Sequence, residues 1–127
     1  MNYPSDRRYS DQHEWIKVDG DVGTVGVTHH AQDALGEIVH VELPAVGKQL
    51  KKGGSAAEVE SVKAVSDVYS PVTGVVTEVN TGLDGNEGAI NSDPHEGGWL
   101  FKVKLAAPAE LEGLMDSAAY AKFEAGG

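Results

Sequence analysis

Turn-forming residues recur along this chain and divide it into runs that are too short for a helical bundle. Glycine occurs 16 times in 127 residues, and the turn signals are Asp19-Gly20, Val46-Gly47, Gly53-Gly54, Thr73-Gly74, Gly82 to Gly85, and Gly97-Gly98. Such residues end or reverse extended segments. Short strands separated by turns of this kind are typical of a β-sandwich or barrel. We therefore expect a mainly β fold of short antiparallel strands.

The runs between these turns have a period of two residues. In the clearest run, Trp99, Phe101, Val103 and Leu105 alternate with Leu100, Lys102 and Lys104. Three further runs alternate in the same way: Val39, Val41 and Leu43 with His40 and Glu42; Ala57 and Val59 with Glu58 and Glu60; Val75, Thr77 and Val79 with Val76 and Glu78. Successive side chains of a strand point to opposite faces. Each run therefore predicts a strand with one buried and one mainly solvated face.

Two segments carry helix signals instead. Residues 28–35 begin at Thr28, a favourable N-cap, and stop at Gly36, the residue that a left-handed C-cap prefers. Near the C-terminus, Pro108 suits a first helical turn, and Ser117 could cap a last turn that carries Tyr120 and Phe123. No Pro- or Ser-rich linker divides the chain. We expect one domain over residues 1–127, with an N-terminal extension at about 1–10 and a C-terminal helical segment at about 108–124.

Charge and the lack of cysteine exclude several classes of function. Twenty Asp and Glu against ten Lys and Arg give a net charge of −10, which disfavours nucleic acid and anionic membranes as partners and favours proteins with basic docking faces. The sequence has no cysteine, which excludes disulfides, thiolate metal sites and a thiol nucleophile. No apolar run approaches the ~20 residues of a membrane span, and the N-terminus is not a secretory signal. We expect a cytoplasmic monomer.

The segment from Glu58 to Tyr69 reads as strand, tight turn, strand, with Lys63 at the turn. A lysine at such a position projects its amine beyond the sheet on a flexible stem. On physical grounds alone, a solvated turn lysine is the ordinary interpretation. Its ammonium group becomes a nucleophile only when another enzyme removes a proton.

The residues around this turn change that interpretation. Glu60-Ser61-Val62-Lys63-Ala64, followed by Ser66-Asp67-Val68-Tyr69-Ser70-Pro71-Val72-Thr73-Gly74, resembles the lipoyl-attachment segment of the glycine cleavage system H-protein family. Further motifs are similar to that family in order and spacing: His13-Glu14-Trp15, Gly26-Val27-Thr28, Leu35-Gly36-Glu37-Ile38-Val39, Val41-Glu42-Leu43-Pro44, Asn91-Ser92-Asp93-Pro94 and Gly97-Gly98-Trp99-Leu100. The resemblance extends from about Tyr9 to Phe123. Its motifs are separate and collinear, so it is specific.

The resemblance implies a barrel-sandwich hybrid of the lipoyl/biotinyl type with added helices. It also implies that lipoate is attached to Lys63 as an amide, in the motif of Glu60, Ser61, Val62, Ala64 and Asp67. The chain would then be a carrier and not an enzyme, and the reactive sulfur would arrive on the lipoate. Its implied partners are glycine decarboxylase, aminomethyltransferase and dihydrolipoyl dehydrogenase, together with a lipoate ligase or a lipoyl/octanoyl transferase.

Two acidic residues are candidates for holding the ammonium of the aminomethyl cargo. They are Glu14, from the His-Glu-Trp motif, and Asp67, from the second strand of the hairpin. The alternative is that both are ordinary surface acids. One segment departs from the family pattern: residues 81–90 are rich in glycine where the family usually has a proline, and we expect this loop to be more mobile.

Several other functions fit these residues less well. The five histidines show no metal-ligand spacing, so no metal site is expected. A biotinyl domain would place methionines on both sides of its lysine, whereas Lys63 lies between Val62 and Ala64. Two alternatives remain open: a lipoyl relay or storage protein that hands lipoyl groups to other enzymes, and an interaction module that carries no modification.

Overall fold

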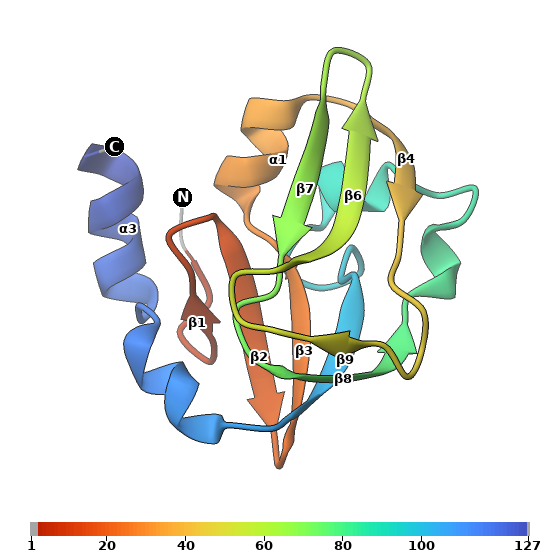
Figure 1. Cartoon of the computed structure of the whole chain (residues 1–127). Coiled ribbons are helices and arrows are strands. Elements are labelled where there is room, and N and C mark those ends of the chain that lie inside the picture. Colours follow the sequence, from red (N-terminus) through yellow and green to blue (C-terminus); the bar gives the residue numbers. More distant parts are fainter. Residues whose placement is uncertain (1–2, 127) are drawn as a thin grey trace.

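The computed structural model describes residues 3–126, which form two antiparallel sheets with short helices at their margins (Figure 1). The larger sheet has the strand order β1-β2-β3-β9-β8-β5, and the smaller has the order β4-β6-β7. The strands are β1 (Arg8–Tyr9), β2 (Glu14–Asp19), β3 (Val22–Val27), β4 (Ile38–Glu42), β5 (Gln49–Leu50), β6 (Ser55–Ser61), β7 (Val65–Tyr69), β8 (Gly74–Val79) and β9 (Phe101–Leu105). Within the described residues the strands do not close into one barrel. The mainly β, antiparallel prediction is confirmed.

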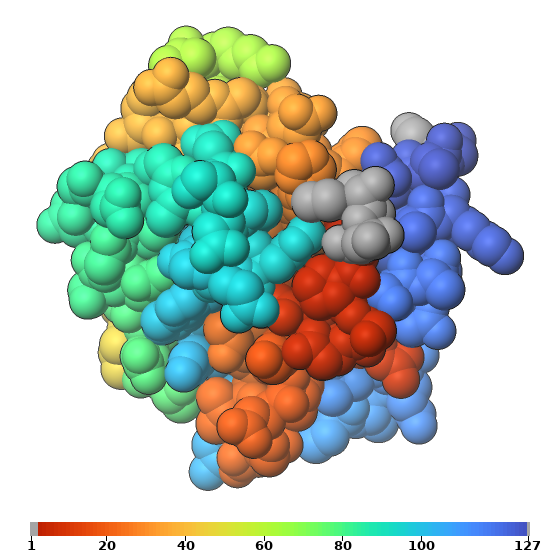
Figure 2. Space-filling view, turned by 180° about the vertical axis from the view of Figure 1, so that it is seen from behind, coloured from red at the N-terminus to blue at the C-terminus, as the bar shows by residue number. Residues whose placement is uncertain are grey.

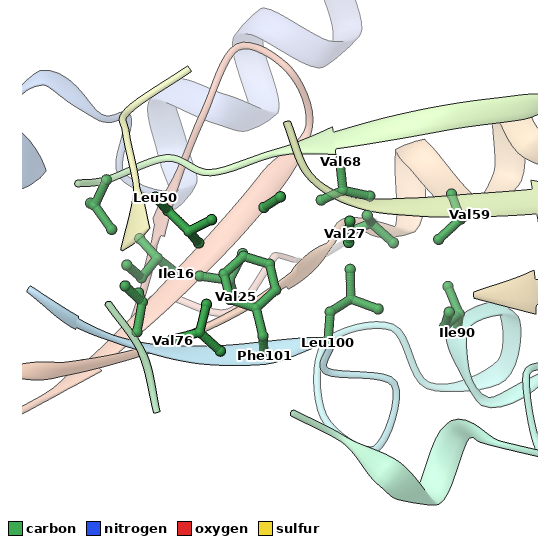
Figure 3. Close-up of a cluster of buried hydrophobic side chains, with 14 of the residues drawn as sticks. Ile16, Val25, Val27, Leu50, Val59, Val68, Val76, Ile90, Leu100 and Phe101 are labelled. Carbon is green, nitrogen blue, oxygen red and sulfur yellow. The ribbon is translucent and has the colours of Figure 1, made fainter. Parts of the chain in front are cut away.

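One apolar core lies between the two sheets, as Figure 3 shows for 14 of its side chains. Phe101 and Val103 of β9 have no exposed surface, and Val59 and Val68 of the smaller sheet belong to the same core. The inward residues alternate with polar ones along β9, as the sequence predicts. Burial of these side chains removes apolar surface from water, which holds the two sheets together.

Two of the predicted alternations are wrong in part, because β-bulges interrupt the strands. In β4 the pairing with β6 shifts between Ile38 and His40, so Ile38 is buried while Val39 is 44% exposed. In β8 the shift lies between Val76 and Glu78, so that Val76 before it and Val79 after it both pack on the core, whereas Val75 is 37% exposed. An inserted residue reverses the inside–outside order of all that follow it. The run at 99–105 also begins late, because β9 starts at Phe101.

The helices are α1 (His29–Leu35), α2 (Ala89–Ser92) and α3 (Ser117–Gly126), with 3-10 turns at η1 (Thr81–Leu83) and η2 (Pro108–Gly113). The predicted N-cap is confirmed, since Thr28 accepts from the amide of Ala31, and the helix ends at Gly36 as predicted. Gly36 has a positive φ of 84°, but its ψ of −159° lies outside the left-handed helical region, so its backbone is not the predicted left-handed cap. The predicted cap at Ser117 is wrong. Asp116 does this instead, through a bond of 2.8 Å from the amide of Ala119 to its carboxylate.

The glycine-rich loop at 81–90 is attached to the core at both ends. Leu83 in η1 and Ile90 in α2 are buried, and they belong to the same core as β9. Asn80 adds hydrogen bonds from its side-chain amide to the carbonyls of Gly97 and Trp99. Mobility of the residues between these two attachments stays a prediction.

The C-terminal helix α3 packs beside β1 and β2, away from the smaller sheet (Figure 1). A second apolar cluster lies beneath it, formed by Tyr3, Tyr9, Trp15 and Tyr120. The rings of Tyr9 and Tyr120 stack with centroids 4.8 Å apart. This cluster fixes α3 against the large sheet. None of the helices in the described chain is long and apolar enough to span a membrane.

Candidate functional site

The β6–β7 hairpin extends beyond the rest of the molecule and ends in the turn that carries Lys63 (Figure 1). From behind, Figure 2 shows its yellow-green tip at the top of the molecule, with the blue C-terminal segment at the side. Val59 of β6 and Val68 of β7 are buried in the core, so both strands of the hairpin are anchored there. The hairpin is therefore a rigid support, and its tip is held at a defined place.

Ser61 determines the shape of the turn. Its amide donates to the carbonyl of Ala64 at 2.8 Å, and its hydroxyl oxygen accepts from the amides of Lys63 and Ala64 at 3.3 and 3.1 Å. Ser61 is buried, although the turn residues after it are exposed. The amide of Val62 donates to the carbonyl of Glu37, which joins the turn to the segment after α1. These bonds satisfy most of the polar backbone of the turn without involving the lysine side chain.

The amine of Lys63 is accessible. The residue is exposed, and none of the salt bridges among residues 3–126 involves it. Its stem passes close to Gly36, where a β-carbon would lie 3.3 Å from Lys63 Cε. On either side of it Val62 and Val65 are 68% and 59% exposed, which is unusual for valine in a small protein. A free amine within an apolar surround suits acylation by a visiting enzyme.

An acidic row crosses the outer face of the smaller sheet below this turn. Glu42 pairs with Glu58 across β4 and β6, and Glu58 pairs with Asp67 across β6 and β7. Like charges directly opposite one another are destabilising in a sheet. Glu60 is also exposed, and it lies on the same side of β6 as Glu58, two residues nearer the tip of the hairpin. The hairpin thus presents a strongly negative face beside Lys63.

Glu14 lies elsewhere, at the start of β2, and is buried with 3% of its surface exposed. Ser10 donates a hydrogen bond of 2.7 Å to one carboxylate oxygen, and the amide of Tyr69 donates one of 3.2 Å to the other. Burial raises the pKa of Glu14 from 4.5 to about 7, and the two hydrogen bonds oppose that rise. Glu14 is therefore not an ordinary surface acid.

A cavity of about 360 Å³ opens at this carboxyl group. Its walls come from the loop before β2, the turn before β6, the end of β7, and the C-terminal segment; they include Glu14, Lys52, Tyr69, Leu114 and Phe123. The cavity has polar and apolar walls together. Such a site can hold the charged end of a ligand against the acid and its carbon chain against the apolar side.

Strand β7 runs from the Lys63 turn to the cavity at Glu14. From Val65 to Tyr69 it covers about 13 Å at the usual rise of a strand. Asp67 and Tyr69 project to the same side because they are two residues apart. Asp67 is exposed, accepts a bond of 3.1 Å from Ser55, and is not among the residues that line the cavity. The structure thus places Glu14 in the cavity and Asp67 on the way to it.

Helix α3 supplies one wall of the cavity through Phe123, and polar contacts hold the helix in place. The hydroxyl of Tyr120 lies 2.7 Å from His13 Nδ1 and 2.8 Å from Thr28 Oγ1. The His13 and His30 rings are 4.3 Å apart, and Glu124 lies 3.1 Å from His30 Nδ1. Among residues 3–126, no group of three His, Asp or Glu side chains could hold a metal.

Sequence reasoning missed Ser10, Lys52, Tyr69 and Phe123 as components of this site. They come from four separate segments of the chain, and their contact depends on how α3 and the β5–β6 turn fold against β2. The alternation pattern reports only whether a side chain faces the core, so it contained no signal for this cavity. For Ser10 alone the sequence offered a signal, because a serine four residues before Glu14 is close enough in the chain to be a candidate hydrogen-bond donor to its carboxylate.

The comparisons with known proteins agree on one family. The model of the family described as glycine cleavage H-protein matches residues 7–125. A glycine cleavage system H protein of Phenylobacterium zucineum is 55% identical over 118 residues, which are 93% of this chain and 98% of the relative. A mitochondrial glycine cleavage system H protein of Pisum sativum is 54% identical over 116 residues, 91% of this chain and 70% of the relative.

The fold leads to the same family. The crystal structure of a glycine cleavage system H protein from Mycobacterium marinum superposes with a TM-score of 0.87 at 40% sequence identity, covering 94% of this chain and 97% of that one. The family match spans nearly all the described residues, and it includes both the Lys63 hairpin and the Glu14 cavity. This chain therefore belongs to the glycine cleavage H-protein family.

Proposed function

We propose that this protein is the lipoyl carrier of a glycine cleavage system and that lipoate is joined to Lys63 through an amide. The observation that supports the proposal is the exposed amine of Lys63 at the tip of a hairpin whose turn is held by Ser61. The amine can reach an enzyme's active site while the body of the protein stays outside. The attached group supplies a disulfide that can accept the aminomethyl cargo and be reduced and reoxidised.

The protein's own residues position this arm and hold its cargo. The rigid hairpin gives the arm a fixed origin, and tethering raises the effective concentration of the cargo at each docked enzyme. We propose that the ammonium of the aminomethyl cargo binds Glu14 in the cavity, with Asp67 as a second contact on the way along β7. A buried carboxylate attracts a cation more strongly than an exposed one, because water screens it less.

The partners follow from the family: glycine decarboxylase, aminomethyltransferase and dihydrolipoyl dehydrogenase, with a lipoate ligase or a lipoyl/octanoyl transferase to load Lys63. The acidic row of Glu42, Glu58 and Asp67 lies beside Lys63 and suits docking faces that are basic. Long-range attraction of this kind speeds encounter more than it tightens the complex. Fast encounter with weak final binding suits a carrier that must dissociate from each enzyme. We place the protein in the cytoplasm.

Intact mass spectrometry after incubation with a lipoate ligase tests the attachment. Wild-type protein should gain the mass of one lipoyl group, and Lys63→Arg should gain none. Lys52→Arg is the matched control, because Lys52 is also exposed and lies near the cavity. An adduct that persists in Lys63→Arg would place the modification on another lysine. If wild type never gains mass, the unmodified interaction module becomes the better account.

The carrier role has its own test. Lipoylated protein should support exchange of bicarbonate with the carboxyl group of glycine when glycine decarboxylase is present. A protein that is lipoylated but inert in this exchange would be a lipoyl relay. Replacing Glu14 and Asp67 by alanine together should shorten the lifetime of the aminomethyl cargo and leave lipoylation intact, and an unchanged lifetime would exclude both residues as contacts.

A further inference from the structure

Ser10 occupies an unusual position beside the acid of the cavity. It is buried, and its hydroxyl group takes part in three hydrogen bonds. It donates to Glu14 Oε1 at 2.7 Å, and its oxygen accepts from the amides of Gln12 and Glu14 at 3.2 Å each. The two amides fix the oxygen, so the hydroxyl hydrogen has one well-placed acceptor, the Glu14 carboxylate. The orientation of that carboxylate therefore depends on Ser10.

The other groups around Glu14 provide little compensation for its charge. Within residues 3–126, its second oxygen accepts one hydrogen bond, from the backbone amide of Tyr69 at 3.2 Å. The titratable groups that line the same cavity are the phenols of Tyr9 and Tyr69, the carboxylate of Asp11 and the ammonium of Lys52. Asp11 raises the pKa of Glu14 further, and no salt bridge to Glu14 occurs among residues 3–126. The hydroxyl of Ser10 is the shortest contact that favours the ionised form.

We propose that Ser10 is a positioning residue that keeps the Glu14 carboxylate aligned and charged toward the cavity, and thereby sets how long the aminomethyl cargo is held. The inference rests on the proposed function for its consequence, but the coupling between Ser10 and Glu14 is a property of the protein without lipoate. A hydrogen bond from a neutral donor to a carboxylate stabilises the charged form selectively. Loss of the hydroxyl should make Glu14 retain its proton to higher pH.

The consequence for the cargo follows from its chemistry. Hydrolysis of the aminomethyl thioether consumes one water and yields the thiol, formaldehyde and ammonium: S–CH2–NH3⁺ + H2O → S–H + CH2O + NH4⁺. The carbon–sulfur bond breaks only after the nitrogen loses a proton, because its lone pair must expel the sulfur. An ionised Glu14 next to the ammonium keeps that proton in place. A protonated Glu14 cannot do so.

Two measurements on Ser10→Ala test this. In protein without lipoate, carbon-13 NMR follows the side-chain carboxyl of Glu14, identified by its disappearance in Glu14→Gln. The midpoint of its titration should rise by about one pH unit in Ser10→Ala. Ser10→Thr keeps a hydroxyl and should restore the wild-type midpoint. Ser92→Ala removes an exposed serine hydroxyl from α2 and is the matched control.

The second measurement uses lipoylated protein loaded with the cargo by glycine decarboxylase, from which formaldehyde release is then followed. We define the protection ratio of a protein as the formaldehyde release rate of Glu14→Gln divided by the release rate of that protein. Because the cargo's own nitrogen titrates in both, its contribution cancels in this ratio. This protection ratio should be roughly fivefold lower in Ser10→Ala than in wild type at pH 7, and equal to it by pH 9. A loss of protection that is the same at all pH values would indicate only structural damage and would overturn the proposal.

The outcomes separate this inference from the function on which it rests. An unshifted carboxyl midpoint in Ser10→Ala overturns the coupling, whatever lipoylated protein does. A shifted midpoint with no change in the protection ratio overturns the role of Ser10 in holding the cargo. If wild type cannot be lipoylated or loaded, the proposed function fails, and the NMR titration still decides whether Ser10 controls Glu14.

Discussion

Replacing Glu14 by glutamine should stabilise the protein, and the gain should depend on pH in a defined way. Glutamine has nearly the same shape as glutamate and keeps an oxygen that can accept from the amide of Tyr69. The substitution therefore removes the titration while preserving the shape of the site. Because Glu14 is buried, the change reports almost entirely on the cost of its charge.

The magnitude follows from the pKa. Folding raises the pKa of Glu14 from 4.5 to about 7, so the native state favours the protonated form. Below pH 4.5 the acid is neutral in both the native and the unfolded state and carries no penalty. As the pH rises from 4.5 to 7, the unfolded chain ionises freely and the native state does not. Each pH unit costs about 1.4 kcal/mol over this interval, which totals about 3 kcal/mol above pH 7.

Urea denaturation of both proteins from pH 4 to pH 9 measures this. The free energy of unfolding of Glu14→Gln minus that of wild type should be near zero at pH 4, rise through the interval, and reach a plateau above pH 7. Taking the difference cancels the contributions that the two proteins share. Glu112→Gln is the control for the loss of one charge, because Glu112 is exposed. Parallel stability curves for Glu14→Gln and wild type would refute the reasoning.

Three further predictions concern other parts of the structure. Ser61→Ala should lower the free energy of unfolding by about 1 to 2 kcal/mol and slow the lipoylation of Lys63, measured by urea denaturation and by intact mass, because the turn loses the oxygen that accepts two amides. The difference in free energy of unfolding between wild type and His95→Gln should become smaller as the pH falls below 6.5. Burial lowers the pKa of His95, whose neutral ring accepts from the amide of His29, so acid favours the unfolded chain. A difference that grows on acidification would contradict this. Gly74→Ala should cost about 3 kcal/mol in denaturation, because its β-carbon would meet a backbone carbonyl of β9, whereas Gly88→Ala, with open space around it, should be nearly neutral.

The acidic row beside Lys63 is an unfavourable arrangement of charges in this small sheet. Glu42, Glu58 and Asp67 lie directly opposite one another although opposite charges or polar residues would pair better. The inner face of the hairpin, with Val59 and Val68 in the core, offsets that repulsion. The arrangement concentrates negative charge at the place where, on our proposal, each enzyme must approach.

Local pattern was enough to predict much of the fold. The alternation along β9, the two ends of α1 at Thr28 and Gly36, and the hairpin around Lys63 each depend on residues close together in the chain. Steric preference and hydrogen bonding act at that range, so these features can be read from a few consecutive residues. The resemblance to the family rested on the same local motifs, and it located the candidate attachment residue.

Other features were decided only when distant segments came together. The bulges in β4 and β8 depend on the register of the neighbouring strands, which moved Val39 outward and Val76 inward. The environment of Glu14 depends on Ser10, on an amide of β7, and on the wall that α3 provides. A charge becomes costly only when the folded chain removes water from around it. The sequence alone therefore identified Glu14 as a candidate, and the tertiary structure made it a buried acid whose pKa is raised from 4.5 to about 7.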